Sequence, residues 1–370
     1  MLPLLVNKAL LALFPRKRRR RVRRALPRLL PEKVKSINLA LQGGGAQGAF
    51  TWGVIEELLL DGRLAIDGIS GASAGAVNAV VLADGLARGG PEEAQRRLAE
   101  FWRAASFGGN LPELPRGVVE RLFSLAPRVA LPSPWLGSLA RLLSPYDYNP
   151  LNLNPLRDLI QRSVDFDLIR DDGRDLFITA TNVHTGELRV FRTTEITADA
   201  VMASACLPVL FRAVEIEGAP YWDGGYAGNP ALLPFLQETA TEDILIVQIN
   251  PLERRRKPRR SHDILTRVHE ITFNAPLLAE LRALELAEAL IEEGRLPRGI
   301  GVGAYRRLRL HRIVMDDEAA DAGKKLNTDY DYFERLRQRG RSAAQLFLDT
   351  HFDDIGHRGT LRTDIAAELV

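Results

Sequence analysis

The sequence predicts an α/β protein in which a mainly parallel central sheet lies between two layers of helices. Two consecutive strand-turn-helix units carry this prediction. An apolar strand over residues 35–42 runs into a glycine turn and a helix over 49–60, and a strand over 65–70 runs into a second small-residue turn and a helix that ends near residue 86. Such units in tandem favour parallel strands covered by their connecting helices, which gives a three-layer α/β/α sandwich.

Further strands and helices follow along the chain. A turn at 184–187 and another at Glu217-Gly218 each join two short apolar runs, which is typical of β-hairpins. The spacing of apolar residues distinguishes the other elements. Strands are predicted over residues 176–182, 188–192, 211–216, 244–249 and 311–315, and helices over 92–101, 263–293 and 331–348.

Composition divides the chain into three parts. Residues 1–35 form a basic arm, residues 36–250 hold the chemical motifs, and residues 251–370 form a mainly helical extension expected to pack on the core. Within the middle part, residues 107–155 are rich in Pro, Leu and Gly without clean periodicity. Long irregular insertions in compact domains are often functional covers, so this segment is a candidate lid; an ordinary insertion packed on the core is the alternative.

The N-terminal arm carries the excess positive charge. Residues 1–36 contain twelve Lys or Arg against the single acidic Glu32, whereas the rest of the chain holds 38 basic and 46 acidic side chains. The apolar stretch at its start is too short to span a bilayer, and no cleavage site follows it. An apolar plug before an arginine run suits docking at an anionic membrane surface; a solvated tail and nonspecific nucleic-acid contact are the alternatives.

Cysteine usage excludes several classes of site. Cys206 is the only cysteine, which rules out an intramolecular disulfide framework and a zinc site built on several thiolates. No group of carboxylates or histidines suggests a metal, and no cofactor is expected. Because no secretory signal is visible, we expect a cytoplasmic protein that visits the inner membrane peripherally.

A candidate nucleophile lies in the second turn, Gly71-Ala72-Ser73-Ala74-Gly75. Gly-x-Ser-x-Gly between a strand and a helix is the nucleophile elbow pattern, in which glycines permit a cramped backbone and the serine is lifted to the end of the sheet. The N-terminus of the following helix would favour negative charge that develops during acyl transfer. Small-residue turns that merely pack a helix on a sheet are the alternative interpretation.

The first turn, Gly43-Gly44-Gly45-Ala46-Gln47-Gly48, admits two interpretations. It fits a loose dinucleotide-binding pattern, but that pattern needs an acidic residue at the end of the next strand. Asp61 falls in a helix-ending turn and Asp67 within a short strand, so neither meets this requirement. Successive glycines after a buried strand can instead aim backbone N–H groups at an oxyanion. We favour this second interpretation.

Asp223 is the candidate base. It lies in Tyr221-Trp222-Asp223-Gly224-Gly225, on a tight turn after a predicted hairpin, where a carboxylate can accept a serine proton directly. Asp-Gly is also an ordinary turn pair. The histidines offer no obvious base, and we expect them at the surface: His184, His262, His269, His311, His351 and His357.

Taken together, the three motifs are similar to those of patatin-like phospholipases, in the same order along the chain. The resemblance covers about residues 36–250 and implies the patatin-like fold and a Ser73-Asp223 dyad. It also implies an oxyanion hole within Gly43, Gly44, Gly45 and Ala46, supported by Gly48, Gly71, Gly75, Gly224 and Gly225. The family often has Arg or Lys where this chain has Gln47, which puts a preference for anionic head groups in doubt.

The resulting hypothesis is a serine hydrolase that cleaves fatty-acyl esters of lipids or phospholipids. Two alternatives stand beside it. One is an α/β-hydrolase with a Ser-His-acid triad, which would need a histidine against Ser73. The other is a non-catalytic protein that keeps the fold. No specific nucleic-acid partner is expected.

Overall fold

A computed structural model describes residues 34–106, 144–149, 152, 154–208, 210–254, 257–294, 308–316 and 329–361. The described residues belong to one compact unit, so the described part of the C-terminal extension belongs to the same body as the chemical motifs. The basic arm and most of the candidate lid lie outside the described residues.

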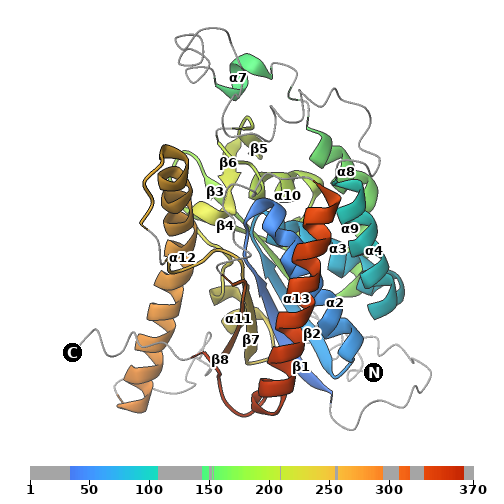
Figure 1. The fold of residues 1–370 in the computed structure, drawn as a ribbon, viewed down its shortest axis with the longest axis vertical. Helices are drawn as coiled ribbons and strands as arrows, with labels where there is room; N and C mark the ends of the chain where they lie inside the picture. Colours follow the sequence, from blue (N-terminus) through green and yellow to red (C-terminus); the bar gives the residue numbers. More distant parts are fainter. Residues whose placement is uncertain are drawn as a thin grey trace, which may run out of the picture. The chain divides into compact units, whose positions relative to one another are not determined.

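The described strands form one eight-stranded, mainly parallel sheet in the order β5-β6-β3-β2-β1-β7-β8, with β4 also paired to β3 (Figure 1). The parallel strands are β1 (Lys35–Leu41), β2 (Leu64–Gly71), β3 (Asp175–Asn182), β7 (Asp243–Gln248) and β8 (Arg309–Val314). The antiparallel strands are β4 (Leu188–Arg192), β5 (Val214–Ile216) and β6 (Ala219–Asp223). The predicted α/β fold with a mainly parallel sheet is therefore confirmed.

Helices cover both faces of the sheet. One face carries α2 (Gly48–Asp61), α3 (Ala74–Gly89), α4 (Pro91–Ala104), α8 (Pro155–Ser163), α9 (Phe166–Asp172), α10 (Ala198–Ser204) and α13 (Tyr330–His351). The other carries α11 (Leu233–Glu238) and α12 (Ser261–Glu292). The short α7 (Pro145–Tyr148) and the 3-10 turns η2 (Gly45–Gln47), η4 (Thr193–Glu195), η5 (Gly224–Tyr226) and η7 (Phe352–Asp354) complete the described elements.

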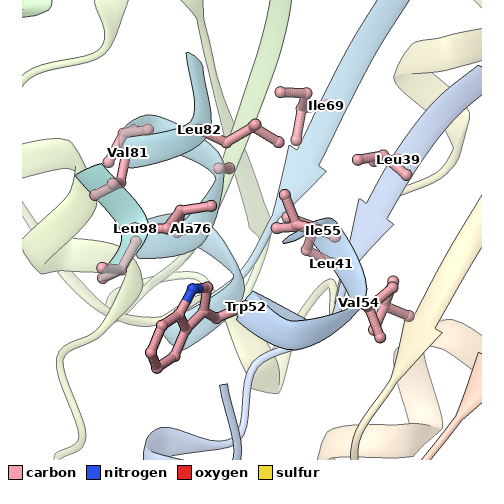
Figure 2. Close-up of a cluster of buried hydrophobic side chains, with 14 of the residues drawn as sticks. Leu39, Leu41, Trp52, Val54, Ile55, Ile69, Ala76, Val81, Leu82 and Leu98 are labelled. Atoms are coloured by element: carbon pink, nitrogen blue, oxygen red, sulfur yellow. The ribbon is translucent and has the colours of Figure 1, made fainter. Parts of the chain in front are cut away.

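Alternation along the strands produces these two cores. Leu39 and Leu41 of β1 face the α2/α3 side, whereas Ala40 between them faces the α11/α12 side. Figure 2 shows Leu41 close to Ile55 of α2, next to the strand that carries Ile69. From Ile37 to Leu41, β1 is buried on both faces, and Asn38 is the one polar residue of that stretch, as expected for an interior parallel strand.

Helices α2 and α13 cross at close range. A Cβ atom on Gly53 would lie 1.9 Å from the backbone oxygen of Arg337, and one on Gly340 would lie 2.1 Å from that of Phe50. Beside the crossing, the Arg337 guanidinium binds both carboxylate oxygens of Glu56 at 2.6 Å. These contacts fix a helix of the C-terminal extension to the helix that follows the glycine turn.

Candidate active site

The ends of three strands bring the three sequence motifs to one edge of the sheet. Leu41 of β1 pairs with Gly71 of β2, and Gly71 pairs with Ile178 of β3. Two residues further along β3, Ala180 pairs with Asp223 of β6. The glycine turn after β1, the serine two residues after Gly71, and Asp223 therefore lie at the same level of the sheet.

Ser73 occupies a strained backbone position at the N-terminus of α3. Its φ of 51° and ψ of −122° fall outside the regions that L-residues favour, as strand-to-helix elbows require. The glycine at position 75 permits the turn, because a Cβ there would lie 2.1 Å from the Leu41 oxygen. The Ser73 N–H donates to Oγ of Ser204 at 2.9 Å. The serine is 7% exposed, at the start of a sixteen-residue helix whose dipole favours negative charge there.

The Asp223 carboxylate is held rigidly at the end of β6. It is fully buried, its Oδ1 accepts the N–H of Gly225 at 2.8 Å, and its backbone N–H donates to the Cys206 oxygen at 2.8 Å. The next two residues are glycines, because their surroundings leave no room for a side chain. A Cβ on Gly224 would lie 2.2 Å from the Thr179 oxygen, and one on Gly225 would lie 2.2 Å from the ring of Phe273.

The residues around Asp223 stay neutral at physiological pH. Burial, and then the negative charge of Asp223, raise the pKa of the Cys206 thiol to about 12. The same two causes, with burial the larger, raise the pKa of Tyr226 to about 12. Because only the thiolate form of a cysteine is strongly nucleophilic, Cys206 does not compete with Ser73 for this role.

The end of α10 and the two residues after it connect the serine to the aspartate. Ser204 accepts the Ser73 N–H through its hydroxyl, and two residues later the Cys206 carbonyl accepts the Asp223 N–H. The hydroxyl of Thr179 adds a second link, donating to the oxygen of Gly228 at 2.8 Å, with the Gly71 oxygen at 3.4 Å. The sequence alone does not indicate this connection, because a serine and a cysteine among alanines carry no motif of their own.

The glycine turn lies directly against the serine. A Cβ on Gly43 would lie 2.6 Å from Cβ of Ser73. The Gly43 N–H donates to Oδ1 of buried Asn229 at 2.7 Å, so it is already engaged and is not open to a substrate oxyanion. Within the described residues, the N–H groups of Gly44, Gly45 and Ala46 donate to no protein acceptor. Of the four residues expected to form an oxyanion hole, Gly44, Gly45 and Ala46 therefore remain candidates.

The neighbouring residues of the turn are packed closely. Gln47 is fully buried against Gly44, and its amide atoms find no hydrogen-bond partner among the described residues. A Cβ on Gly48 would lie 2.8 Å from Cβ of Ala74. Gly48 thus allows the N-termini of α2 and α3 to approach each other.

Residues from the far end of the chain support the glycine turn. Gln42 accepts the N–H groups of Ile249 and Asn250 at 2.9 and 2.8 Å and donates to Oδ1 of Asn274 at 2.9 Å. Asn250 in turn donates to the oxygen of Gly43 at 2.6 Å. Sequence reasoning missed Asn274, and the available signal was an asparagine within an otherwise apolar stretch of a predicted helix.

The histidines are distributed differently from the expectation. His311 was expected at the surface, but it is fully buried, between Asp243 at 3.0 Å and Thr360 at 3.1 Å, because β8 joins the sheet and encloses it. Asp243 begins β7, at the opposite edge from Ser73. On the motif side, His269 stacks on Phe273 with ring centroids 3.9 Å apart, so it is the histidine to test as an alternative base.

Within the described residues, no group of three or more His, Cys, Asp or Glu side chains is arranged to hold a metal ion. Likewise, none of the described helices has an apolar run long enough to cross a membrane.

Comparison with models of protein families gives a match. A model described as patatin-like phospholipase matches residues 39–236, which contain all three motifs. Among curated proteins, no sequence matches the chain.

Solved structures give distant similarities. VipD from Legionella pneumophila aligns over 87% of this chain and 67% of its own, with 16% identity and a TM-score of 0.37. ExoU, solved in complex with SpcU from Pseudomonas aeruginosa, aligns over 86% of this chain and 54% of its own, with 16% identity and a TM-score of 0.34.

Proposed function

The chain belongs to the patatin-like phospholipase family, and on that basis we propose that it is a serine lipid acyl hydrolase in which Ser73 is the nucleophile and Asp223 the general base. Family membership supports hydrolysis of lipid esters in general. The assignment of the two residues rests chiefly on one observation: the strained serine at the start of α3 and the buried carboxylate of β6 lie at the same level of the sheet.

The proposed reaction begins with proton transfer from the Ser73 hydroxyl to the Asp223 carboxylate, while Oγ bonds to the ester carbonyl carbon. The oxyanion that forms accepts hydrogen bonds from the N–H groups of Gly44, Gly45 and Ala46, with the α3 dipole adding to its stabilisation. When the intermediate collapses, the C–O bond to the alcohol breaks and the proton on Asp223 passes to that oxygen. Water, deprotonated by Asp223, then attacks the acyl carbon of the acyl-serine. The C–Oγ bond breaks, Oγ takes the proton from Asp223, and the fatty acid is released.

The burial of Asp223 suits this role. A carboxylate surrounded by the neutral groups Cys206 and Tyr226 meets little competing water, so its charge acts on the serine in a medium of low polarity. The carboxylate is also held in place, because its Oδ1 accepts the Gly225 N–H.

The test is hydrolysis of a soluble chromogenic acyl ester by the wild type and by Ser73→Ala, Asp223→Asn and His269→Ala. We expect the first two substitutions to lower kcat by at least about a thousandfold, because each removes a group that acts only in the transition state. The third should leave kcat within a few fold. Circular dichroism checks that each variant is folded.

Retention of activity in folded Asp223→Asn, together with its loss in His269→Ala, would replace the dyad by a serine-histidine mechanism. Equal inactivity of the wild type and Ser73→Ala on esters of every chain length would instead favour a non-catalytic protein.

A further inference from the structure

Helix α12 exposes a row of large apolar side chains in its N-terminal half. Ile264, Leu265, Val268 and Ile271 are 45%, 70%, 55% and 54% exposed. Their spacing of three and four residues puts them on one side of the helix. A contiguous exposed apolar row often marks an interaction site, whereas single exposed apolar residues are normal on protein surfaces.

The row projects beyond the edge of the sheet that carries Ser73. At Phe273 and Asn274, α12 contacts the Gly225 turn and Gln42. Its C-terminal half packs away from this edge, because Leu277, Leu281 and Leu284 share a core with β7 and with Leu308, which precedes β8. The residues before Phe273 therefore continue past the edge, at about 1.5 Å per residue, as the upper part of α12 in Figure 1 indicates.

Unpaired positive charge lies next to the row. Lys257, Arg259 and Arg260 are exposed, and they form no ion pair with any described carboxylate. By contrast, the neighbouring guanidiniums of Arg254 and Arg267 both bind the buried Glu270. The two cations that fasten this loop to α12 thus share a buried carboxylate, whereas the three outward cations remain available.

We propose that the N-terminal half of α12 and residues 257–260 form the surface on which the protein docks to an anionic phospholipid membrane. The apolar row inserts below the head groups, and the three cations contact lipid phosphates. A second copy docked through the same face would also cover the apolar row, but it would place its own three cations against these three. An anionic membrane covers the row and attracts the cations. The inference rests on the proposed function, because docking in this orientation turns the edge that carries Ser73 toward its lipid substrate.

The experiment is flotation of the full chain with phosphatidylcholine vesicles, with and without phosphatidylglycerol, using Ser73→Ala so that no lipid is consumed. We expect binding that requires the anionic lipid. Leu265→Ser should weaken it by about tenfold, since it removes an inserting side chain. The matched control is Leu346→Ser, an equally exposed leucine on α13 at 68%, which should bind as the parent does.

Charge substitutions test the second half of the surface. Lys257→Gln and Arg259→Gln should each weaken binding roughly fivefold, as expected for about one kcal/mol per basic residue near the lipid. Arg282→Gln, on the far half of the same helix, should have no effect. When the same substitutions are made in the chain that keeps Ser73, each variant should hydrolyse a soluble ester as the wild type does.

The proposal fails if Leu265→Ser binds vesicles as tightly as Leu346→Ser. It also fails if sedimentation shows a dimer that Leu265→Ser dissociates while vesicle binding is unchanged, since the row would then be a self-association surface. Failure of the hydrolase proposal looks different: the wild type would cleave no ester, while Leu265-dependent binding persisted.

Discussion

At the scale of single residues, one asparagine connects the glycine turn to α12. Asn229 is fully buried, accepts the Gly43 N–H at 2.7 Å through Oδ1, and donates to the Phe273 oxygen at 3.0 Å through Nδ2. A buried amide satisfied at both ends fixes orientation, because each lost partner would leave a desolvated polar group. Asn229 therefore determines where the proposed oxyanion donors point without touching the substrate itself.

Replacing Asn229 should impair turnover more than binding. We expect Asn229→Ala to lower the free energy of unfolding by about 1–3 kcal/mol and to reduce kcat by about ten- to a hundredfold, with KM changing little. Both constants can be measured on a soluble ester.

The control for that experiment is Asn38→Ala. Asn38 is also fully buried and donates to Thr239 and Thr241, but it lies in the middle of β1 and makes no bond to the glycine turn. It should lose comparable stability and keep kcat. A kcat that falls equally in both variants would mean that general loosening of the fold, and not placement of the turn, explains the effect.

At the scale of elements, the crossing of α2 and α13 depends on two glycines. The backbone of each helix fills the space in which the side chain of the other helix's glycine would lie. The pairs Arg337-Glu56 and Arg341-Glu57 flank the contact and select its register. Because α2 begins directly after the glycine turn, this crossing also sets the direction in which the chain leaves the candidate site.

Gly340→Ala should be strongly destabilising. A methyl group 2.1 Å from the Phe50 oxygen forces the helices apart, which typically costs 1–3 kcal/mol or more, roughly several degrees in Tm for a domain of this size. Thermal unfolding measures it. Ser342→Ala, on the exposed side of the same helix, should stay within about 0.5 kcal/mol of the wild type. If Ser342→Ala lost as much stability as Gly340→Ala, the helix crossing would not be the explanation.

Elements with strong patterns could be predicted from the sequence, and short ones could not. The strand-turn-helix units, the Glu217-Gly218 hairpin and the long helix over 261–292 are found where apolar spacing and turn residues indicate them. Helices α8, α9, α10 and α11 were not predicted. They have nine residues or fewer, too few for a clear period, and three of them start at single capping side chains.

At the scale of the whole molecule, α12 is fastened to α11, its neighbour on the same face of the sheet, by a partly buried acid. Glu280 accepts the N–H groups of Leu232 and Leu233 at 2.6 and 3.3 Å, at the start of α11. Burial raises its pKa to about 7, although these two N–H groups act in the other direction. A carboxyl group whose pKa is higher in the folded protein stabilises the fold while it is protonated.

That stabilisation should be lost as pH rises from the unfolded value of about 4.3 to about 7. Glu280→Gln keeps an acceptor oxygen and cannot ionise. We therefore expect it to match the wild type near pH 4 and to exceed it by up to about 3 kcal/mol at pH 8. Urea unfolding across this range provides the measurement, and parallel pH curves for the two proteins would show that Glu280 does not titrate in this way.

The motif residues of the candidate site could be predicted from the sequence, but the supports that fix them could not. Ser73 and Asp223 stand in patterns that chemistry makes recognisable. Asn229, Asn250 and Asn274 gain meaning only when folding brings three distant segments to one turn. The prediction of Gly43 as an oxyanion donor fails for the same reason. Its N–H already donates to Asn229, and no pattern in the sequence indicates that contact.

The bond between Gln42 and Asn274 also has a consequence for synthesis, because it spans 232 positions of the chain. At roughly 5–20 residues per second, a ribosome reaches Asn274 on the order of ten to fifty seconds after Gln42. During that interval the emerging polypeptide already contains Ser73 and, later, Asp223, without the support that holds the glycine turn beside them. The proposed site is therefore completed only after the ribosome has passed Asn274.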